Sequence, residues 1–314
     1  MTTFRTWLRS LLAVLLLSTL TMAPARAANP PHVALVMKSL ANPFFSAMAD
    51  GAKAHAKAHA ADYKLTVTGI DNETDKAAQI RIVQKLIAEK VDAIVLAPAD
   101  SRDLIPVVGQ ALAAGILVVN IDNKLDDRVL AEQGINVPFV GPSNRAGSRQ
   151  VGEFLAKTLH PHDKVAIIEG ISTTTNAQAR TAGFREAMEA VDVNVVAVRS
   201  GQWETNIAYK VAADLLRENA DLSALLCGND SMALGAVAAV HDAGRDGRVK
   251  VVGYDNIPTV RPMLADGRLL ATADQFAGEQ AVYGIELALK AIKEKTAQTA
   301  LPAMVQTPVK LITK

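Results

Sequence analysis

Cysteine is almost absent from this 314-residue chain, which contains only Cys227. A single thiol cannot form an internal disulfide, so stability must come from packing. Because Cys227 lies in the short apolar run 224–227, we expect it to be a buried, small apolar residue rather than a nucleophile. Aromatic residues are also scarce, at 4 % against 50 % hydrophobic residues overall. A core of Ala, Val, Ile and Leu favours parallel sheets covered by helices over an antiparallel sandwich.

The sequence also lacks an excess of charge of either sign. The formal net charge is +1, and no dense block of Lys and Arg follows residue 27. We therefore expect neither a nucleic-acid partner nor binding to an anionic membrane surface.

Catalytic and metal-binding motifs are missing as well. The sequence has no G-x-S-x-G, H-E-x-x-H, G-x-x-x-x-G-K-[ST] or G-x-G-x-x-G motif. His55 and His59, four residues apart, could form a surface metal site, although an alanine-rich helix can carry such histidines incidentally. Residues 71–75 resemble part of a calcium loop but lack its glycine and its distal glutamate. The sequence therefore predicts no enzyme, no metal and no cofactor.

The N-terminal segment contains the long hydrophobic run. Arg5 and Arg9 precede and flank the apolar residues 11–20, and Ala25-Arg26-Ala27 matches a small-x-small cleavage signal. This order is typical of a secretory signal peptide, here residues 1–27. An uncleaved anchor helix is the alternative, but the apolar run is shorter than the roughly 20 residues that span a bilayer. We expect an exported protein in the periplasm of a Gram-negative cell.

After the signal peptide, short apolar runs alternate with helix-length amphipathic stretches, and the pattern restarts near residue 137. Such alternation predicts right-handed crossovers and parallel sheets. Both halves end an apolar strand with Asp-Asn, at 122–123 and 255–256. We infer a duplicated α/β unit, because the chain is long enough for two domains with a core each.

The predicted fold is two doubly wound, Rossmann-like parallel-sheet domains joined by a three-strand hinge. The first domain is expected over residues 28–141 plus 276–307, and the second over 142–275 plus 308–314. The chain is expected to cross between them near Gly141, Gln275 and Pro308. Ligands of such sheets bind beyond the carboxyl ends of the strands, so a cleft between the two domains is the expected site.

Polar and aromatic residues follow the predicted strands in both halves. Each has a plainer reading as a helix cap, turn residue, core aromatic or solvated charge. Together they suit a neutral polyhydroxylated ligand, because carboxylates accept hydroxyl donors, amides donate and accept, and aromatic faces stack on sugar C–H groups. The candidate ligand-binding residues are Asn42, Phe44, Phe45, Asp122, Asn123, Arg180, Trp203, Asn229, Asp255 and Gln275.

Three segments carry a resemblance to a known family. Asn42-Pro43-Phe44-Phe45, the run 229–236 (NDSMALGA) and the run 251–255 (VVGYD) resemble periplasmic sugar-binding proteins of ABC importers, of the ribose-binding type. The resemblance covers essentially the whole chain after the signal peptide. It implies the type I periplasmic binding protein fold and a sugar-binding role for the candidate residues other than Asn123.

Two positions depart from the pattern of ribose binders. Ribose binders have an arginine where this chain has Asn123, and an asparagine where this chain has Ala97. The loss of a guanidinium and an amide changes the set of hydrogen-bond donors. Ribose, another pentose, a hexose and a linear polyol therefore all remain open as ligands.

The resemblance implies a monomeric receptor that closes its hinge around a small sugar or polyol. It would deliver the ligand to the transmembrane permease subunits of an ABC transporter with a cytoplasmic ATPase. A periplasmic sensing subunit for a chemoreceptor or sensor kinase is the alternative, and neighbouring genes would separate the two. An exported enzyme on this fold is disfavoured because no nucleophile–base pair is evident. Regulators of the lactose-repressor type share the fold, but here a signal peptide replaces their DNA-binding helices.

Overall fold

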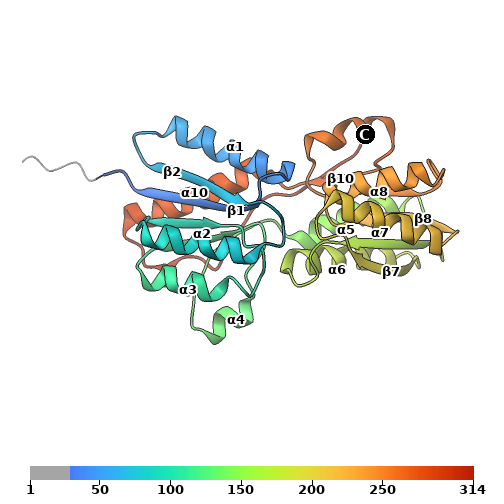
Figure 1. Cartoon of the computed structure of the whole chain (residues 1–314). Helices are drawn as coiled ribbons and strands as arrows, with labels where there is room; N and C mark the ends of the chain where they lie inside the picture. Colours follow the sequence, from blue (N-terminus) through green and yellow to red (C-terminus); the bar gives the residue numbers. More distant parts are fainter. Residues whose placement is uncertain (1–28) are drawn as a thin grey trace, which may run out of the picture. The chain divides into compact units, whose positions relative to one another are not determined.

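The computed structural model describes residues 29–314, in which strands and helices alternate along the chain (Figure 1). The predicted signal peptide, residues 1–27, lies outside the described residues. Within the described part of the chain, no helix combines the length and apolar character needed to cross a membrane.

Six parallel strands form the first sheet, in the order β11-β5-β4-β3-β1-β2. Helices α1 and α10 pack together along one face and α2 and α3 along the other. We call this sheet and helices α1–α4 and α10 the six-stranded half. Its strands are β1 (His32–Ser39), β2 (Lys64–Ile70), β3 (Ala93–Leu96), β4 (Leu117–Ile121), β5 (Phe139–Gly141) and β11 (Met304–Gln306). Its helices are α1 (Pro43–Ala58), α2 (Lys76–Ala88), α3 (Ile105–Ala113), α4 (Asp127–Glu132), α10 (Ala277–Glu294) and the 3₁₀ turn η2 (Gln298–Ala300).

Strand β1 shows why this sheet is covered on both faces. Val33, Leu35 and Met37 belong to the apolar cluster on the α1 and α10 side. The alternate residues Ala34 and Val36 belong to the cluster on the α2 and α3 side. Successive side chains of a strand point to opposite faces, so a continuous apolar run is buried on both.

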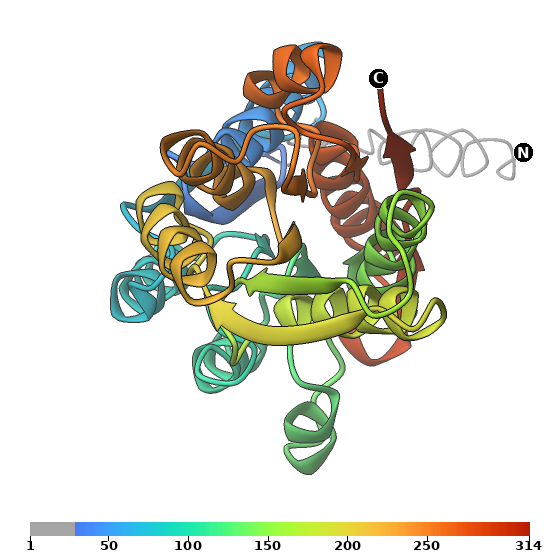
Figure 2. The same cartoon turned by 90° about the vertical axis from the view of Figure 1, so that its right-hand side faces the viewer.

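Four parallel strands form the second sheet, in the order β7-β6-β8-β9. Helices α5 and α6 pack together, as do α7 and α8, and Figure 2 shows helices on both sides of this sheet. With the β10–β12 pair, these elements make the four-stranded half. Its strands are β6 (Lys164–Glu169), β7 (Asn194–Ser200), β8 (Leu222–Cys227), β9 (Lys250–Val252), β10 (Thr272–Asp274) and β12 (Lys310–Ile312). Its helices are α5 (Asn144–Ala156), α6 (Thr175–Glu189), α7 (Thr205–Glu218), α8 (Asp230–Asp242), α9 (Arg261–Asp266) and the 3₁₀ turn η1 (Pro258–Val260).

Within residues 29–314, the chain passes between the two halves three times, after β5, between β10 and α10, and between β11 and β12. The predicted class of two Rossmann-like parallel-sheet domains is confirmed. The exact domain boundaries stay a prediction. Two features differ from the expected alternation: β10 and β12 pair antiparallel, and helices α4 and α9 were not predicted. Elements of three to six residues are too short to show a clear period in the sequence.

Gln79 of α2 fixes the carboxyl ends of two neighbouring strands. Its side chain is fully buried, and Nε2 donates to the carbonyl oxygens of Met37 (3.1 Å) and Ala97 (2.9 Å). Oε1 accepts from the backbone N–H of Ala99 at 2.7 Å. Buried backbone groups need such partners where the sheet ladder ends. Gln79 therefore helps to hold the end of β1, where Lys38 lies.

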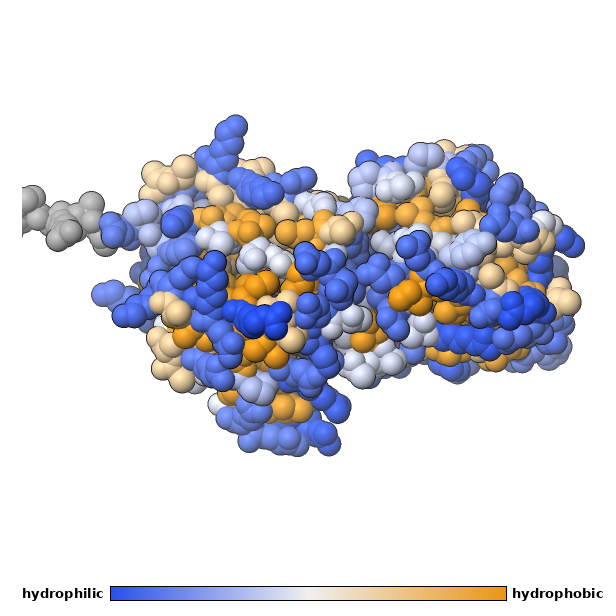
Figure 3. Space-filling view, in the orientation of Figure 1, coloured by the Kyte–Doolittle hydropathy of each residue, from blue (hydrophilic) through white to orange (hydrophobic). Residues whose placement is uncertain are grey.

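One face of the molecule carries mainly polar side chains. Figure 3 shows hydrophilic residues over both halves of one face, with smaller hydrophobic areas between them. Within residues 29–314, the exposed large hydrophobic side chains come from separate segments: Leu40, Val191, Val196, Tyr283 and Met304. Scattered residues of this kind are normal on a soluble surface. The buried polar cavity described next is the feature that indicates binding.

Candidate functional site: a polar cavity between the two halves

A small polar cavity lies where the carboxyl ends of strands from both sheets meet. Its walls come from both halves, and nine of the ten residues predicted from the sequence line it. Asn123 is the exception, and two further residues, Lys38 and Asn176, were not predicted. That these side chains contact a ligand stays a prediction. The lining residues are Lys38, Asn42, Phe44, Phe45, Asp122, Asn176, Arg180, Trp203, Asn229, Asp255 and Gln275.

The turn from β1 into α1 places the first group of lining residues. Asn42 is the N-cap of α1, and its Oδ1 accepts from the backbone N–H of Phe44 at 3.1 Å. Pro43 occupies the first helical turn, where its missing N–H is tolerated. The rings of Phe44 and Phe45 meet edge to face, with centroids 5.1 Å apart. The cap therefore fixes an amide and two aromatic rings at one wall of the cavity.

Arg180 reaches the cavity from α6 and is 3 % exposed, so it is not a solvated helix charge. Its Nε donates to Oδ1 of Asn144 (2.7 Å), and Nη1 donates to the carbonyl oxygen of Gly228 (2.8 Å). Nη1 also lies 3.4 Å from Oδ1 of Asp255, and the guanidinium stacks 3.9 Å from the ring centre of Tyr254. These contacts fix the orientation of the guanidinium.

Trp203 packs against two glycines. A Cβ on Gly170 would lie 2.0 Å from two atoms of the indole ring, and one on Gly228 would lie 3.2 Å from it. The ring is 3 % exposed, with the Lys38 ammonium and the Arg180 guanidinium each 5.4 Å from its centre. Gly170 is therefore required for this position of the ring.

Three lining residues adopt left-handed backbone conformations. The φ angles are 60° for Asp122, 66° for Trp203 and 117° for Asp255. Each follows the carboxyl end of a strand in a connecting segment. Non-glycine residues in such conformations are strained by roughly 1–3 kcal/mol and cluster at functional sites. The strain lies at the positions where the sequence predicted binding.

The charges around the cavity are nearly balanced. Lys38 and Arg180 carry positive charge, while Asp122, Asp255 and the adjacent Glu73 are carboxyl groups. Burial raises the pKa of Asp255 to about 7, against the opposing effect of Arg180. Its Oδ1 accepts a hydrogen bond from Nε2 of Gln275 at 2.7 Å. A cavity of this composition suits a neutral polar molecule better than an ion.

Three buried polar atoms of the lining residues have no hydrogen-bond partner within residues 29–314. They are Oδ2 of Asp122, Nε1 of Trp203 and Oε1 of Gln275. Leaving such atoms unpaired is unfavourable by roughly 1–3 kcal/mol each. One donor and two acceptors are thus available to a ligand that both donates and accepts hydrogen bonds, as a hydroxyl group does.

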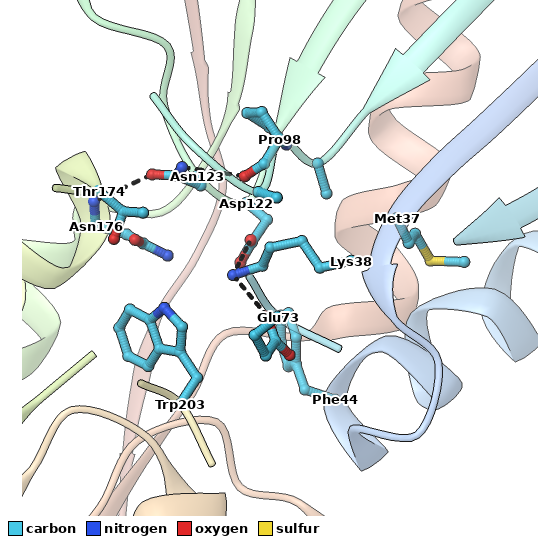
Figure 4. Close-up of polar contacts among 12 residues, drawn as sticks. Met37, Lys38, Phe44, Glu73, Pro98, Asp122, Asn123, Thr174, Asn176 and Trp203 are labelled. Carbon is cyan, nitrogen blue, oxygen red and sulfur yellow. Dashed lines mark hydrogen bonds and ion pairs between the residues drawn. The ribbon is translucent and has the colours of Figure 1, made fainter. Parts of the chain in front are cut away.

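Lys38 is the main residue that the sequence analysis missed. It follows the buried strand segment 33–37, and its side chain lies between carboxylates and aromatic rings (Figure 4). Nζ is 3.2 Å from Oε2 of Glu73, 3.7 Å from Oδ2 of Asp122 and 5.2 Å from the ring centre of Phe45. The sequence could have indicated this residue by its place at the end of an otherwise apolar strand. Lysine is rarely fully buried without a partner, so a lysine at such a position points to a buried ion pair.

Asn123 and Ala97, the two departures from the ribose-binding pattern, are buried and do not line the cavity. Nδ2 of Asn123 donates to the carbonyl oxygen of Pro98 at 3.1 Å (Figure 4). Its Oδ1 accepts from Oγ of Ser101 (3.2 Å) and from the backbone N–H of Asn176 (3.3 Å). Ala97 is fully buried in the apolar cluster. Asn123 therefore joins the two halves instead of facing the cavity.

Further hydrogen bonds join the halves beside Asn123. Oγ1 of Thr173 donates to Oδ2 of Asp100 at 3.0 Å, and the backbone N–H of Thr175 donates to Oγ of Ser101 at 2.9 Å. On the other side of the cavity, Oγ of Ser231 donates to Oδ1 of Asn42 at 3.5 Å. The two halves are therefore in direct contact beside the cavity.

Comparison with known proteins decides the family. A model of the periplasmic binding protein domain matches residues 33–296. The chain belongs to the type I periplasmic sugar-binding proteins. A protein of Pseudomonas aeruginosa named as a D-ribose/D-allose-binding protein is 57 % identical, over 97 % of this chain and 98 % of that protein. The relatives are solute-binding proteins, and this periplasmic binding protein is not an enzyme.

Solved structures agree with this assignment. An ABC transporter solute-binding protein from Burkholderia multivorans is 59 % identical, with a TM-score of 0.89, over 91 % of this chain and all of that one. Its unknown ligand was interpreted as α-D-erythrofuranose. A solute-binding protein from Actinobacillus succinogenes with bound D-allose is 34 % identical, with a TM-score of 0.84, over 90 % of this chain and 98 % of that one.

Proposed function

We propose that this protein binds a neutral monosaccharide of the ribose–allose class in the cavity between its two halves. Its place is the periplasm, where it delivers the sugar to the permease of an ABC importer. The ligand-binding residues are those that line the cavity, with Lys38 and Asn176 added to the nine predicted ones.

This proposal rests on three side-chain atoms of the cavity that have no hydrogen-bond partner within residues 29–314. Oδ2 of Asp122 and Oε1 of Gln275 can accept from sugar hydroxyls, and Nε1 of Trp203 can donate to one. Phe44 and Phe45 add apolar ring surface suited to the C–H groups of a sugar ring. The balanced charges disfavour an anionic or cationic ligand, since its charge would be buried without a full counter-charge.

The choice among sugars is supported by the relatives. The names of the Pseudomonas protein and of an Escherichia coli relative, 33 % identical over 89 % of this chain, both include D-allose. The Actinobacillus structure also holds D-allose. D-Allose and D-ribose are therefore the first ligands to test.

Closure of the halves around the sugar is the proposed mechanism of delivery. Asn42, Phe45 and Asp122 line the cavity from one half, whereas Arg180 and Trp203 line it from the other. A ligand that touches both sets binds the closed form better and shifts the equilibrium toward it. The permease would then distinguish loaded from empty protein by the closed arrangement.

Calorimetric titration of the purified protein tests the binding step. We expect D-allose or D-ribose to bind with micromolar or tighter affinity, while a sugar phosphate and an amino acid produce no heat. Release of the protein from cells by osmotic shock, without detergent, tests the compartment. Binding of only the charged compounds would overturn the proposed ligand class.

A further inference from the structure

Glu73 is a buried carboxyl group beside the cavity that does not line it. It comes from the loop between β2 and α2, is 1 % exposed and belongs to none of the segments that the sequence analysis singled out as ligand-binding. Oε2 lies 3.2 Å from Nζ of Lys38, and Oε1 accepts from Nδ2 of Asn42 at 3.0 Å. One carboxylate thus contacts two cavity-lining side chains.

The amide of Asn42 has only one orientation that satisfies its neighbours. Its Oδ1 accepts from the N–H of Phe44 as the cap of α1, so Nδ2 must face the other way. There it meets the carboxylate of Glu73. An amide with one proton committed to a carboxylate keeps its second proton available for a ligand.

The ammonium of Lys38 depends on carboxylates in a similar way. Burial acts to lower its pKa, but Glu73 and then Asp122 outweigh burial and raise it above the usual value. Glu73 is the nearer of the two, at 3.2 Å against 3.7 Å. A lysine ammonium has three donors, so contacts with two carboxylates leave a third N–H for a ligand.

We propose that Glu73 is a positioning residue of the sugar site, which holds Lys38 charged and directed toward a ligand hydroxyl. This inference rests on the proposed function. It adds that part of the selectivity is set by a residue that does not touch the sugar. Loss of Glu73 would leave Lys38 with Asp122 alone, and Asp122 would then be drawn from the ligand toward the ammonium.

The substitution Glu73→Gln separates this role from packing. Glutamine keeps the size of the side chain and an oxygen that can accept from Asn42, but it removes the charge next to Lys38. We expect the affinity for D-allose, measured by calorimetry at pH 7.5, to fall about tenfold. Asp71→Asn is the matched control, because it removes one negative charge from an exposed residue of the same loop. A loss of less than threefold in Glu73→Gln would overturn the proposal.

The dependence of the affinity on pH separates this role from a role in packing, because a change in packing alone would not alter it. Other charged groups that face Lys38 are Asp122, Arg180 and Asp255. The pKa of Asp255 is raised to about 7, so this group is ionised above pH 8. The pKa of Lys38 is raised in the wild-type protein, so the ammonium keeps its proton from pH 8 to 10. The affinity of the wild-type protein for D-allose should therefore stay constant over this range. In Glu73→Gln the affinity should decline within this range, and an unchanged profile would contradict the role.

A double-mutant cycle with Lys38→Met completes the test. If Glu73 acts through Lys38, Lys38→Met and the double variant should bind D-allose with affinities within threefold of each other. If the losses of affinity in the two single variants multiply in the double variant, Glu73 acts by another route and the proposal is overturned. If either single variant fails to fold while the double variant folds, that rescue supports the coupling. Failure of the wild-type protein to bind D-allose or D-ribose would instead count against the proposed function itself.

Discussion

Replacement of Asp255 by asparagine should weaken sugar binding and stabilise the free protein. The side chain is 4 % exposed, accepts from Gln275 and lies beside Arg180. Asparagine keeps the shape but loses the charge that strengthens a hydrogen bond from a ligand hydroxyl. A hydrogen bond to a charged group contributes roughly 1.5–3 kcal/mol, which corresponds to an affinity loss of about 10- to 150-fold.

The effect on stability has the opposite sign. The pKa of Asp255 rises from 3.8 to about 7 in the folded protein, chiefly because the group is buried. Between about pH 4 and pH 7 the folded state therefore binds this proton more tightly than the unfolded chain does, so stability falls as pH rises. At about 1.4 kcal/mol per pKa unit, ionisation reduces the free energy of unfolding by up to about 4 kcal/mol above pH 7. Asp255→Asn removes this penalty.

Thermal unfolding of the ligand-free proteins at pH 5 and pH 8, with calorimetry on D-allose, tests both effects. The melting temperature of Asp255→Asn should exceed that of the wild type by more at pH 8 than at pH 5, by up to roughly 10 °C. The exposed Asp71→Asn variant should show neither change. A lower melting temperature at pH 8 together with an affinity within threefold of wild type would refute the reasoning.

Three further outcomes are expected. Gln79→Leu removes the side-chain partner of three buried backbone groups and should lower the free energy of unfolding in urea by about 3–6 kcal/mol; a change below about 1 kcal/mol would contradict this. Gly170→Ala should displace the Trp203 ring and reduce the affinity for D-allose about tenfold, and unchanged affinity would remove this ring from the site. Small-angle scattering should show a smaller radius of gyration with saturating D-allose, and an unchanged radius would argue against closure.

Much of the site could be predicted because polar residues at the ends of apolar strands stand out in a sequence. Asn42, Asp122 and Asp255 each follow a buried strand, and parallel strands bring their carboxyl ends to one edge of a sheet. The same reasoning placed Asn123 in the cavity, although it is turned away to bind Pro98 and Asn176. Adjacent residues of a turn point in different directions, and the sequence does not reveal which of them faces the ligand.

The sequence by itself determined the alternation of strands and helices, because the apolar period and the helix caps are local properties of the chain. It also determined the residue types that collect at the strand ends. Only the tertiary structure decided that Lys38 and Glu73 form a buried pair, since they lie on separate strand–loop units 35 residues apart. Which charges share a low-dielectric cavity depends on long-range packing, and the burial that raises the pKa of Asp255 does not exist until both halves are folded.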